Sequence, residues 1–174
     1  MTDFTDVRRA QRADQDRVGR LWNDFLREQE AMDERLQVAD DALERWHNDF
    51  PMWLDDDTRR LYVAAPNDTV EGFAMAHRTG PPPIYEPMQE VYLDELYVVP
   101  DARRQGLGRQ LVQAVRHWAE QLPAGRLRLQ MMSANETARA FWEALGASAF
   151  STSMTLELDA DGEAATPERR RIGF

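Results

Sequence analysis

The sequence predicts an α/β fold in which helices flank a mixed β-sheet. Residues 91–99 are rich in β-branched and aromatic residues and alternate polar with apolar, which is typical of a strand. From Leu107, apolar residues recur at helical spacing and leave one face to be buried. A further strand pattern follows at 126–132. Because a helix connects the two strands, we expect them to run parallel.

Apolar periodicity and turn residues predict the other elements. Strands are expected over residues 4–9, 61–65, 72–78 and 151–158, and helices from Asp14, near 39–48 and over 137–145. Gly146 fits the C-terminal cap of the last helix. We therefore expect a single domain over residues 1–158. Residues 159–174 are expected to be a charged C-terminal tail that is flexible or contacts a partner.

Composition restricts the class of protein. A chain of 174 residues that is 43% hydrophobic is long and apolar enough for one globular domain. Its zero cysteines exclude disulfides, thiolate metal sites and a cysteine nucleophile, and its three histidines have no metal-ligand spacing, so no metal is expected. No long apolar run or signal-peptide core is present, which predicts a cytoplasmic protein without membrane contact. The net charge of −10 argues against nucleic-acid binding and is compatible with small cationic ligands.

A glycine-rich segment lies between the predicted strand and helix, with the sequence Arg-Arg-Gln-Gly-Leu-Gly at 103–108. Glycines allow the backbone to turn tightly and expose its N–H groups, where the helix N-terminus adds the positive end of its dipole. Arg103, Arg104 and Arg109 concentrate positive charge in an acidic chain, which favours an anion site over an ordinary turn with exposed arginines. Leu111 stands where a dinucleotide fingerprint requires glycine, and the Gly-Lys-Ser/Thr of a Walker loop is absent.

Two motifs in this chain resemble those of the GNAT superfamily of N-acetyltransferases. Arg103 to Gly108 matches the R-x-x-G-x-G signature, and the preceding strand at 93–100 resembles the superfamily's fourth strand. Asn135 to Ala147 resembles the N-x-x-A-x-x-F-Y-x-x-x-G-(F/A) helix. The resemblance extends over residues 4–158, the first half by pattern rather than by motif. It implies a mostly antiparallel sheet whose central parallel strands splay apart, with acetyl-CoA as co-substrate.

The resemblance also implies which residues bind the cofactor. Main-chain groups of Leu96, Tyr97 and Val98 would bond the pantetheine arm, and backbone N–H groups from Arg104 through Arg109 would hold the pyrophosphate. The whole predicted cradle is Arg103, Arg104, Gln105, Gly106, Leu107, Gly108 and Arg109. The second motif implies that the other side of the cofactor is lined by Asn135, Ala138, Phe141 and Trp142.

Asp94 and Glu95 are the predicted catalytic residues. An alkyl ammonium group has a pKa of roughly 10.4, so a carboxylate is needed to attract the amine and take its proton. Neighbouring side chains of a strand face opposite ways, so only one carboxylate reaches a given pocket unless a bulge intervenes. A resemblance to diamine and polyamine acetyltransferases favours Asp94 as base and Glu95 as acceptor contact. A salt-bridged pair of strand carboxylates is the alternative.

Trp142 departs from the family pattern, in which a tyrosine at this position protonates the departing thiolate. Indole is not a usable acid, so the sequence identifies no general acid. A thiol pKa of roughly 8.5 still makes thiolate a tolerable leaving group. We expect an acetyl-CoA-dependent N-acetyltransferase that acts directly on a primary amine of a small cationic acceptor. The alternatives are a protein lysine or N-terminal acetyltransferase and a non-catalytic CoA-binding regulatory module. Dimers are common among such proteins, so a homodimer is one expectation.

Overall fold

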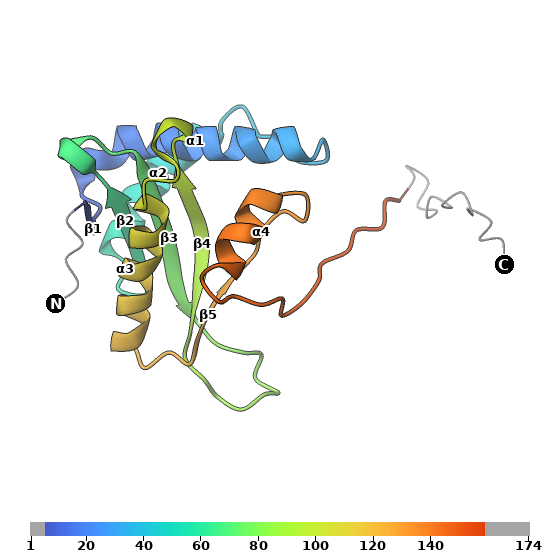
Figure 1. The fold of residues 1–174 in the computed structure, drawn as a ribbon. Helices are drawn as coiled ribbons and strands as arrows, with labels where there is room; N and C mark the ends of the chain where they lie inside the picture. Colours follow the sequence, from blue (N-terminus) through green and yellow to red (C-terminus); the bar gives the residue numbers. More distant parts are fainter. Residues whose placement is uncertain (1–5, 159–174) are drawn as a thin grey trace. The chain divides into compact units, whose positions relative to one another are not determined.

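A computed structural model of the chain describes residues 6–158 (Figure 1). The chain consists of two compact units, Met1–Asn135 and Glu136–Phe174. The strands are β1 (Val7–Arg9), β2 (Arg59–Ala64), β3 (Gly72–Thr79), β4 (Glu90–Val98) and β5 (Arg126–Leu129). The α-helices are α1 (Gln15–Met32), α2 (Ala42–Asp55), α3 (Leu107–Gln121) and α4 (Glu136–Glu143), and single 3-10 turns lie at Arg12–Asp14, Pro66–Asp68 and Pro100–Ala102.

The first unit contains one five-stranded sheet with the order β1-β2-β3-β4-β5. Each neighbouring pair from β1 to β4 is antiparallel, whereas β4 and β5 are parallel. Helix α3 makes the crossover between these two parallel strands, as the strand–helix–strand pattern predicts. The predicted mixed, mostly antiparallel sheet flanked by helices is therefore confirmed.

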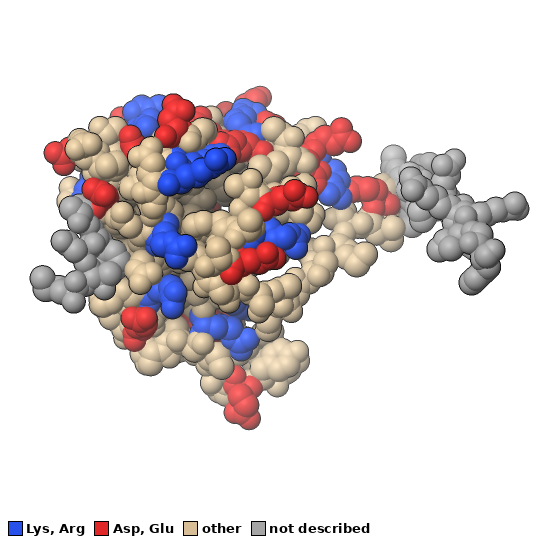
Figure 2. Space-filling view, in the orientation of Figure 1, with Lys and Arg blue, Asp and Glu red and all other residues tan. Residues whose placement is uncertain are grey.

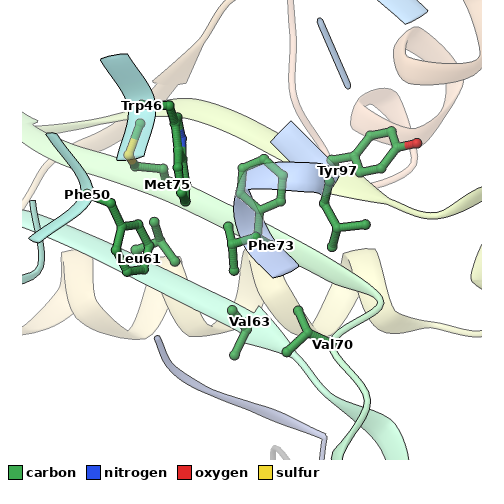
Figure 3. Packing of buried hydrophobic residues seen from close by; sticks show 10 residues of the cluster. Trp46, Phe50, Leu61, Val63, Val70, Phe73, Met75 and Tyr97 are labelled. Atoms are coloured by element: carbon green, nitrogen blue, oxygen red, sulfur yellow. The ribbon is translucent and has the colours of Figure 1, made fainter. Parts of the chain in front are cut away.

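Helices α1 and α2 cover one face of the sheet and form the main core there. The core side chains come from both helices and from β2, β3 and β4, and Figure 3 shows the aromatic ones from α2 against the sheet. Apolar residues at positions three and four apart, such as Val18 and Leu21, turn one side of α1 inward, and both are fully buried. The helix predicted from Asp14 is thus confirmed, with its first α-helical residue at Gln15.

Helix α3 covers the opposite face of the sheet (Figure 1). Its predicted apolar positions are all buried: Leu107, Leu111, Val112, Val115, Trp118 and Ala119. The N-terminus of this helix directly follows the glycine-rich segment, so the packing of α3 fixes where that segment lies.

The largest differences from the sequence prediction are two element ends and one missing strand. Helix α2 continues through Pro51 to Asp55 because Phe50, Trp53 and Leu54 pack into the core and outweigh the helix-breaking proline. Strand β5 ends at Leu129 rather than at 132. The strand predicted at 151–158 is wrong, since 151–157 have no regular secondary structure and Leu158 has only an isolated bridge. An alternating pattern becomes a strand only when a neighbouring strand pairs with it. The apolar side chains of this segment, such as Met154 and Leu156, are instead exposed.

The second unit contains α4, the helix of the second motif. The rings of Phe141 and Trp142 meet edge to face with centroids 5.0 Å apart. Gly146 has φ +86°, and its N–H donates to the carbonyl of Glu143, so it caps the helix as predicted. The predicted tail at 159–174 and residues 4 and 5 of the first predicted strand lie outside the described residues. None of the helices between residues 6 and 158 has the length and apolar character that a bilayer crossing requires.

Candidate active site

A β-bulge in β4 places both predicted catalytic carboxylates on the same face of the sheet. Met75 of β3 pairs with Glu95, but the next residue, Ala76, pairs with Leu93, so Asp94 is an extra residue in β4. Such an insertion interrupts the alternation of side chains. Asp94 contacts His77 of β3 and Glu95 contacts Trp22 of α1, so both point toward the face that α1 and α2 cover. The bulge allowed for in the sequence analysis is therefore present.

Asp94 is held by two basic side chains. His77 Nδ1 lies 2.9 Å from both carboxylate oxygens, and Nη1 of Arg59 lies 3.7 Å from Oδ2. The side chains of His77 and Asp94 remain 29% and 21% exposed, so a solvent-borne molecule can reach the pair. The ring of Tyr92 lies 5.6 Å from the His77 ring and forms one side of the pair.

Glu95 has a different environment. The Trp22 indole N–H donates to Glu95 Oε1 at 2.7 Å, whereas Oε2 is buried and has no hydrogen-bond partner among the described residues. The residue as a whole is only half-buried, but its carboxylate lies in the interior. Burial raises the pKa of Glu95 to about 7, and the negative charge of Asp94 adds to the rise, while Trp22 and Arg59 oppose it. A carboxylate with this pKa exchanges protons near neutral pH.

Among the described strands, none pairs with one edge of β4 beside these carboxylates, and this edge is called the open edge. Pairing between β4 and β5 ends at Leu93 and Leu129, yet β4 continues to Val98. The other edge of β4 pairs with β3, and there Val99 N–H donates to the Glu71 carbonyl. Because every second residue of an antiparallel strand turns its backbone groups toward the same neighbour, Tyr97 also faces β3. The backbone groups of Leu96 and the N–H of Val98 therefore face the open edge, whereas those of Tyr97 do not; the Val98 carbonyl accepts from Arg103 Nε.

The predicted cradle follows β4 and leads into α3. Arg104 has φ +64° and Gly106 has φ +90°, both in the left-handed region, so the backbone turns sharply here. Within residues 6–158, the backbone N–H groups of 104–109 donate to no other group, and the first bond of the helix is from Gln110 N–H to the Gly106 carbonyl. A turn of unpaired N–H groups at a helix N-terminus fits an anion such as a diphosphate.

Arg103 is already occupied by contacts within the chain. One of its terminal nitrogens donates to both carboxylate oxygens of Glu28 in α1, its Nε donates to the Val98 carbonyl at 2.8 Å, and its guanidinium lies over the Tyr97 ring. The Tyr97 hydroxyl also donates to Glu28 at 3.0 Å. Burial raises the pKa of Tyr97 to about 12, and the hydrogen bond to Glu28 adds to the rise, so the phenol remains protonated.

The basic side chains near the cradle are arginines, since the chain has no lysine. Figure 2 shows arginine side chains over the side of the sheet that α3 covers, with carboxylates between them. Arg104 and Arg109 are exposed and form no ion pair with another described residue. These two, rather than Arg103, have charge available for a ligand.

The second-motif residues are divided between the two units. Asn135 ends the first unit, while Ala138, Phe141 and Trp142 lie on α4 in the second. Trp142 is buried, and Asn135 N–H donates to the Met132 carbonyl. Their contact with a cofactor stays a prediction.

Comparison with known proteins identifies the family. Residues 19–147 match the family described as Acetyltransferase (GNAT) family. The chain belongs to this family. A GNAT protein of this kind is an acetyl-CoA-dependent N-acetyltransferase, and acetyl-CoA is its acetyl donor. The comparison with curated proteins finds no match.

Solved structures with the same fold have little sequence identity to this GNAT chain. A tetramutant of the BH1408 protein from Bacillus halodurans is 20% identical with a TM-score of 0.78, and the match covers 87% of this chain and 99% of that one. AAC(6')-Iy in complex with a bisubstrate analogue is 18% identical with a TM-score of 0.70, over 87% and 96% of the two chains. A ribosomal-protein-alanine N-acetyltransferase from Brucella melitensis biovar Abortus 2308 is 18% identical with a TM-score of 0.63, over 88% and 98%.

The structure adds site residues that the sequence did not single out. Trp22 lies 73 residues before its partner Glu95, and no local pattern connects the two. Arg59 and Glu28 were likewise not predicted. His77 could have been identified from the sequence, because a histidine near the end of a strand can face an acceptor. The structure pairs it with Asp94. Within residues 6–158, no group of three or more His, Cys, Asp or Glu side chains is arranged to hold a metal.

Proposed function

We propose that this GNAT protein transfers the acetyl group of acetyl-CoA directly to a primary amine of a small cationic acceptor, with Glu95 as the general base. The observation that carries the proposal is the Glu95 carboxylate, which is buried beside the open edge of β4 and has one oxygen without a partner in the described part of the chain. A general base is most effective when its pKa lies near the working pH, and the pKa of Glu95 is about 7. These roles reverse the sequence-based expectation, which made Asp94 the base.

The residues of the first unit fit the donor. Bound acetyl-CoA supplies an acetyl group that is activated as a thioester. Leu96 and Val98 would hold the pantetheine arm through backbone groups at the open edge, as a neighbouring strand would. The unpaired N–H groups of 104–109 would hold the pyrophosphate, assisted by Arg104 and Arg109. Arg103 supports this site by fixing the end of β4 to α1.

Asp94 is proposed to contact the acceptor. Its carboxylate is partly exposed, and it shares the face with Glu95 because of the bulge. A cationic amine next to Asp94 would be guided toward Glu95, which then removes a proton from the nitrogen that attacks. His77 and Arg59 fix the orientation of Asp94.

Proton return to the thiolate does not depend on Trp142, whose indole has no acidic proton to give. The Tyr97 phenol donates to Glu28 and keeps its proton, since its pKa is about 12. Solvent is sufficient for a thiol with an ordinary pKa of roughly 8.5. We therefore assign no general acid.

The class of acceptor is inferred from charge and from the neighbours. The net charge of −10 and the two carboxylates at the bulge favour a cation. Two structural neighbours are aminoglycoside acetyltransferases, which supports an amine-bearing small molecule as acceptor; a diamine or polyamine has the same chemistry. A protein N-terminus is the second candidate, because a ribosomal-protein-alanine N-acetyltransferase has the same fold.

Release of free CoA tests the proposal. The protein is mixed with acetyl-CoA and a panel of polyamines, aminoglycosides, lysine peptides and peptides with free N-termini. We expect turnover with at least one small cationic amine and a loss of about 100-fold or more in Glu95→Gln. Glu120→Gln is the matched control, because Glu120 lies on α3 with its side chain 72% exposed. Intact CoA binding without turnover on any amine would contradict the proposal and favour a regulatory module.

A further inference from the structure

Trp22 is the one aromatic side chain of α1 that contacts a proposed catalytic group within the described residues. Its indole N–H donates to Glu95 Oε1 at 2.7 Å, from a different element and 73 residues away. The other carboxylate oxygen, Oε2, is buried and has no hydrogen-bond partner within residues 6–158. The two oxygens of one carboxylate therefore differ: one is held by a hydrogen bond, and the other is buried without a partner among these residues.

We propose that Trp22 is a positioning residue, which fixes the Glu95 carboxylate through Oε1 so that Oε2 is the atom that takes the proton from the acceptor. The inference rests on the proposed function of Glu95 as the base. The inference adds the residue that determines which oxygen reacts and how that oxygen is oriented. Without the indole, the carboxylate could rotate about its last bond and exchange the two oxygens.

The packing around Trp22 makes it suitable for this task. Its ring lies 6.1 Å from that of Trp46, which in turn lies 4.7 Å from Phe50 and 5.9 Å from Trp53. Trp46 and Phe50 are among the most buried residues of the core. The indole is thus held by two helices at once, and a donor on a rigid support fixes its acceptor more closely than a flexible polar side chain would.

The bond also affects the charge of Glu95. The charged groups that face this carboxylate are Asp94 from β4 and Arg59 from β2, and His77 of β3 joins through Asp94. From α1, Trp22 provides a neutral donor, which favours the ionised form. Burial and the charge of Asp94 raise the pKa of Glu95, and Trp22 is one of the two groups that lower it. Loss of this donor therefore raises the pKa further. Hydrogen bonds to charged groups have the strength to move a pKa by about one unit.

Trp22→Phe and Trp53→Phe test the inference as a matched pair. Both remove an indole from the same aromatic cluster, but only Trp22 donates to Glu95. In Trp22→Phe, we expect the acid limb of the kcat/KM profile to move up by about one pH unit. That shift lowers kcat/KM about fivefold at pH 7, and above pH 9 kcat/KM returns to the value of the parent protein. In Trp53→Phe, we expect the limb to stay where it is. A uniform loss at all pH values in Trp22→Phe would overturn the proposal.

A second measurement needs neither turnover nor the Trp22 variant. In the free protein, the indole 15N–1H resonance of Trp22 should shift with pH as Glu95 ionises, with a midpoint near pH 7. In Glu95→Gln, this titration should vanish, while the other indoles keep their behaviour. A Trp22 resonance that does not titrate in the parent protein would overturn the inference even if acetyl transfer is found. Failure of the proposed function would instead show as absent turnover with the indole titration intact.

Discussion

Arg103 and Glu28 form an ion pair between the start of the cradle and α1, with one Arg103 nitrogen 2.7 and 2.8 Å from the two Glu28 oxygens. The same arginine binds the Val98 carbonyl, and Tyr97 donates to the same glutamate. The first arginine of the R-x-x-G-x-G motif thus connects α1 to the end of β4.

Arg103→Gln should affect stability more than CoA binding. The pair is more than a third exposed on both sides, so we expect a loss of about 1 kcal/mol or less in the free energy of unfolding. Arg104→Gln and Arg109→Gln should each weaken CoA binding by about three- to tenfold, with a smaller effect at high salt. Calorimetry with CoA and urea unfolding would measure both. A larger loss of CoA affinity in Arg103→Gln than in the other two variants would mean that Arg103 leaves Glu28 to bind the ligand.

Gly106→Val should weaken CoA binding by about tenfold or more. Gly106 has φ +90°, and a Cβ at this position would meet no atom within 4 Å, so the cost comes from the backbone conformation and not from a clash. Valine is strained at this φ and would turn the neighbouring N–H groups away from the ligand. Gly106→Asn is the control, because asparagine tolerates the left-handed region and should keep most of the affinity. Equal affinities of both variants and the parent protein would exclude the cradle as the pyrophosphate site.

Glu95→Gln should stabilise the protein at pH 8 while it removes activity. The pKa of Glu95 rises from 4.5 in the unfolded chain to about 7 in the folded one, so the folded state holds this proton more tightly. The corresponding stability is fully present below pH 4.5 and is lost as the pH rises through 7. Glutamine avoids this loss, which amounts to about 3 kcal/mol or less.

Urea unfolding of Glu95→Gln and the parent protein at pH 5 and pH 8 would measure this difference. The change in free energy of unfolding on substitution should be more favourable at pH 8 than at pH 5. The exposed substitution Glu120→Gln should give no such dependence. The same change at both pH values would show that the carboxylate of Glu95 is not desolvated in solution.

Asp94→Asn should separate acceptor binding from proton removal. Asparagine keeps the shape but removes the charge beside His77, so we expect the KM for the amine to rise by about tenfold and kcat to fall less than in Glu95→Gln. The negative charge of Asp94 also raises the pKa of Glu95, so its removal should move the acid limb of the pH profile down. If kcat falls as far as in Glu95→Gln and KM stays constant, Asp94 is the base, as the sequence alone had suggested.

Local patterns were enough to predict the parts of the fold that depend on local physics. The apolar face of α3 follows from residues three and four apart, and the parallel pair β4 and β5 follows from the helix between them. The turn at Gly106 follows from the glycines. Each of these elements is determined within about one helix or strand of sequence.

The parts that could not be predicted depend on pairing across the chain. The bulge at Asp94 exists because Met75 and Ala76 of β3 are paired with residues that are two apart in β4, and nothing within 93–98 indicates the extra residue. The contact of Trp22 with Glu95 depends on how α1 lies on the sheet. The expected strand at 151–158 has the right alternation, but within residues 6–158 it forms no ladder beyond the isolated bridge at Leu158.

The open edge beside Leu96 and Val98 has an evolutionary consequence. Binding of a ligand through backbone amide and carbonyl groups depends on the spacing of the residues and not on their side chains. Substitutions of Leu96 and Val98 themselves can therefore be tolerated, whereas insertion or removal of a single residue would turn the wrong amides outward. Drift in composition with strict conservation of length is what we expect between distant members, in keeping with neighbours that share the fold at 18–20% identity.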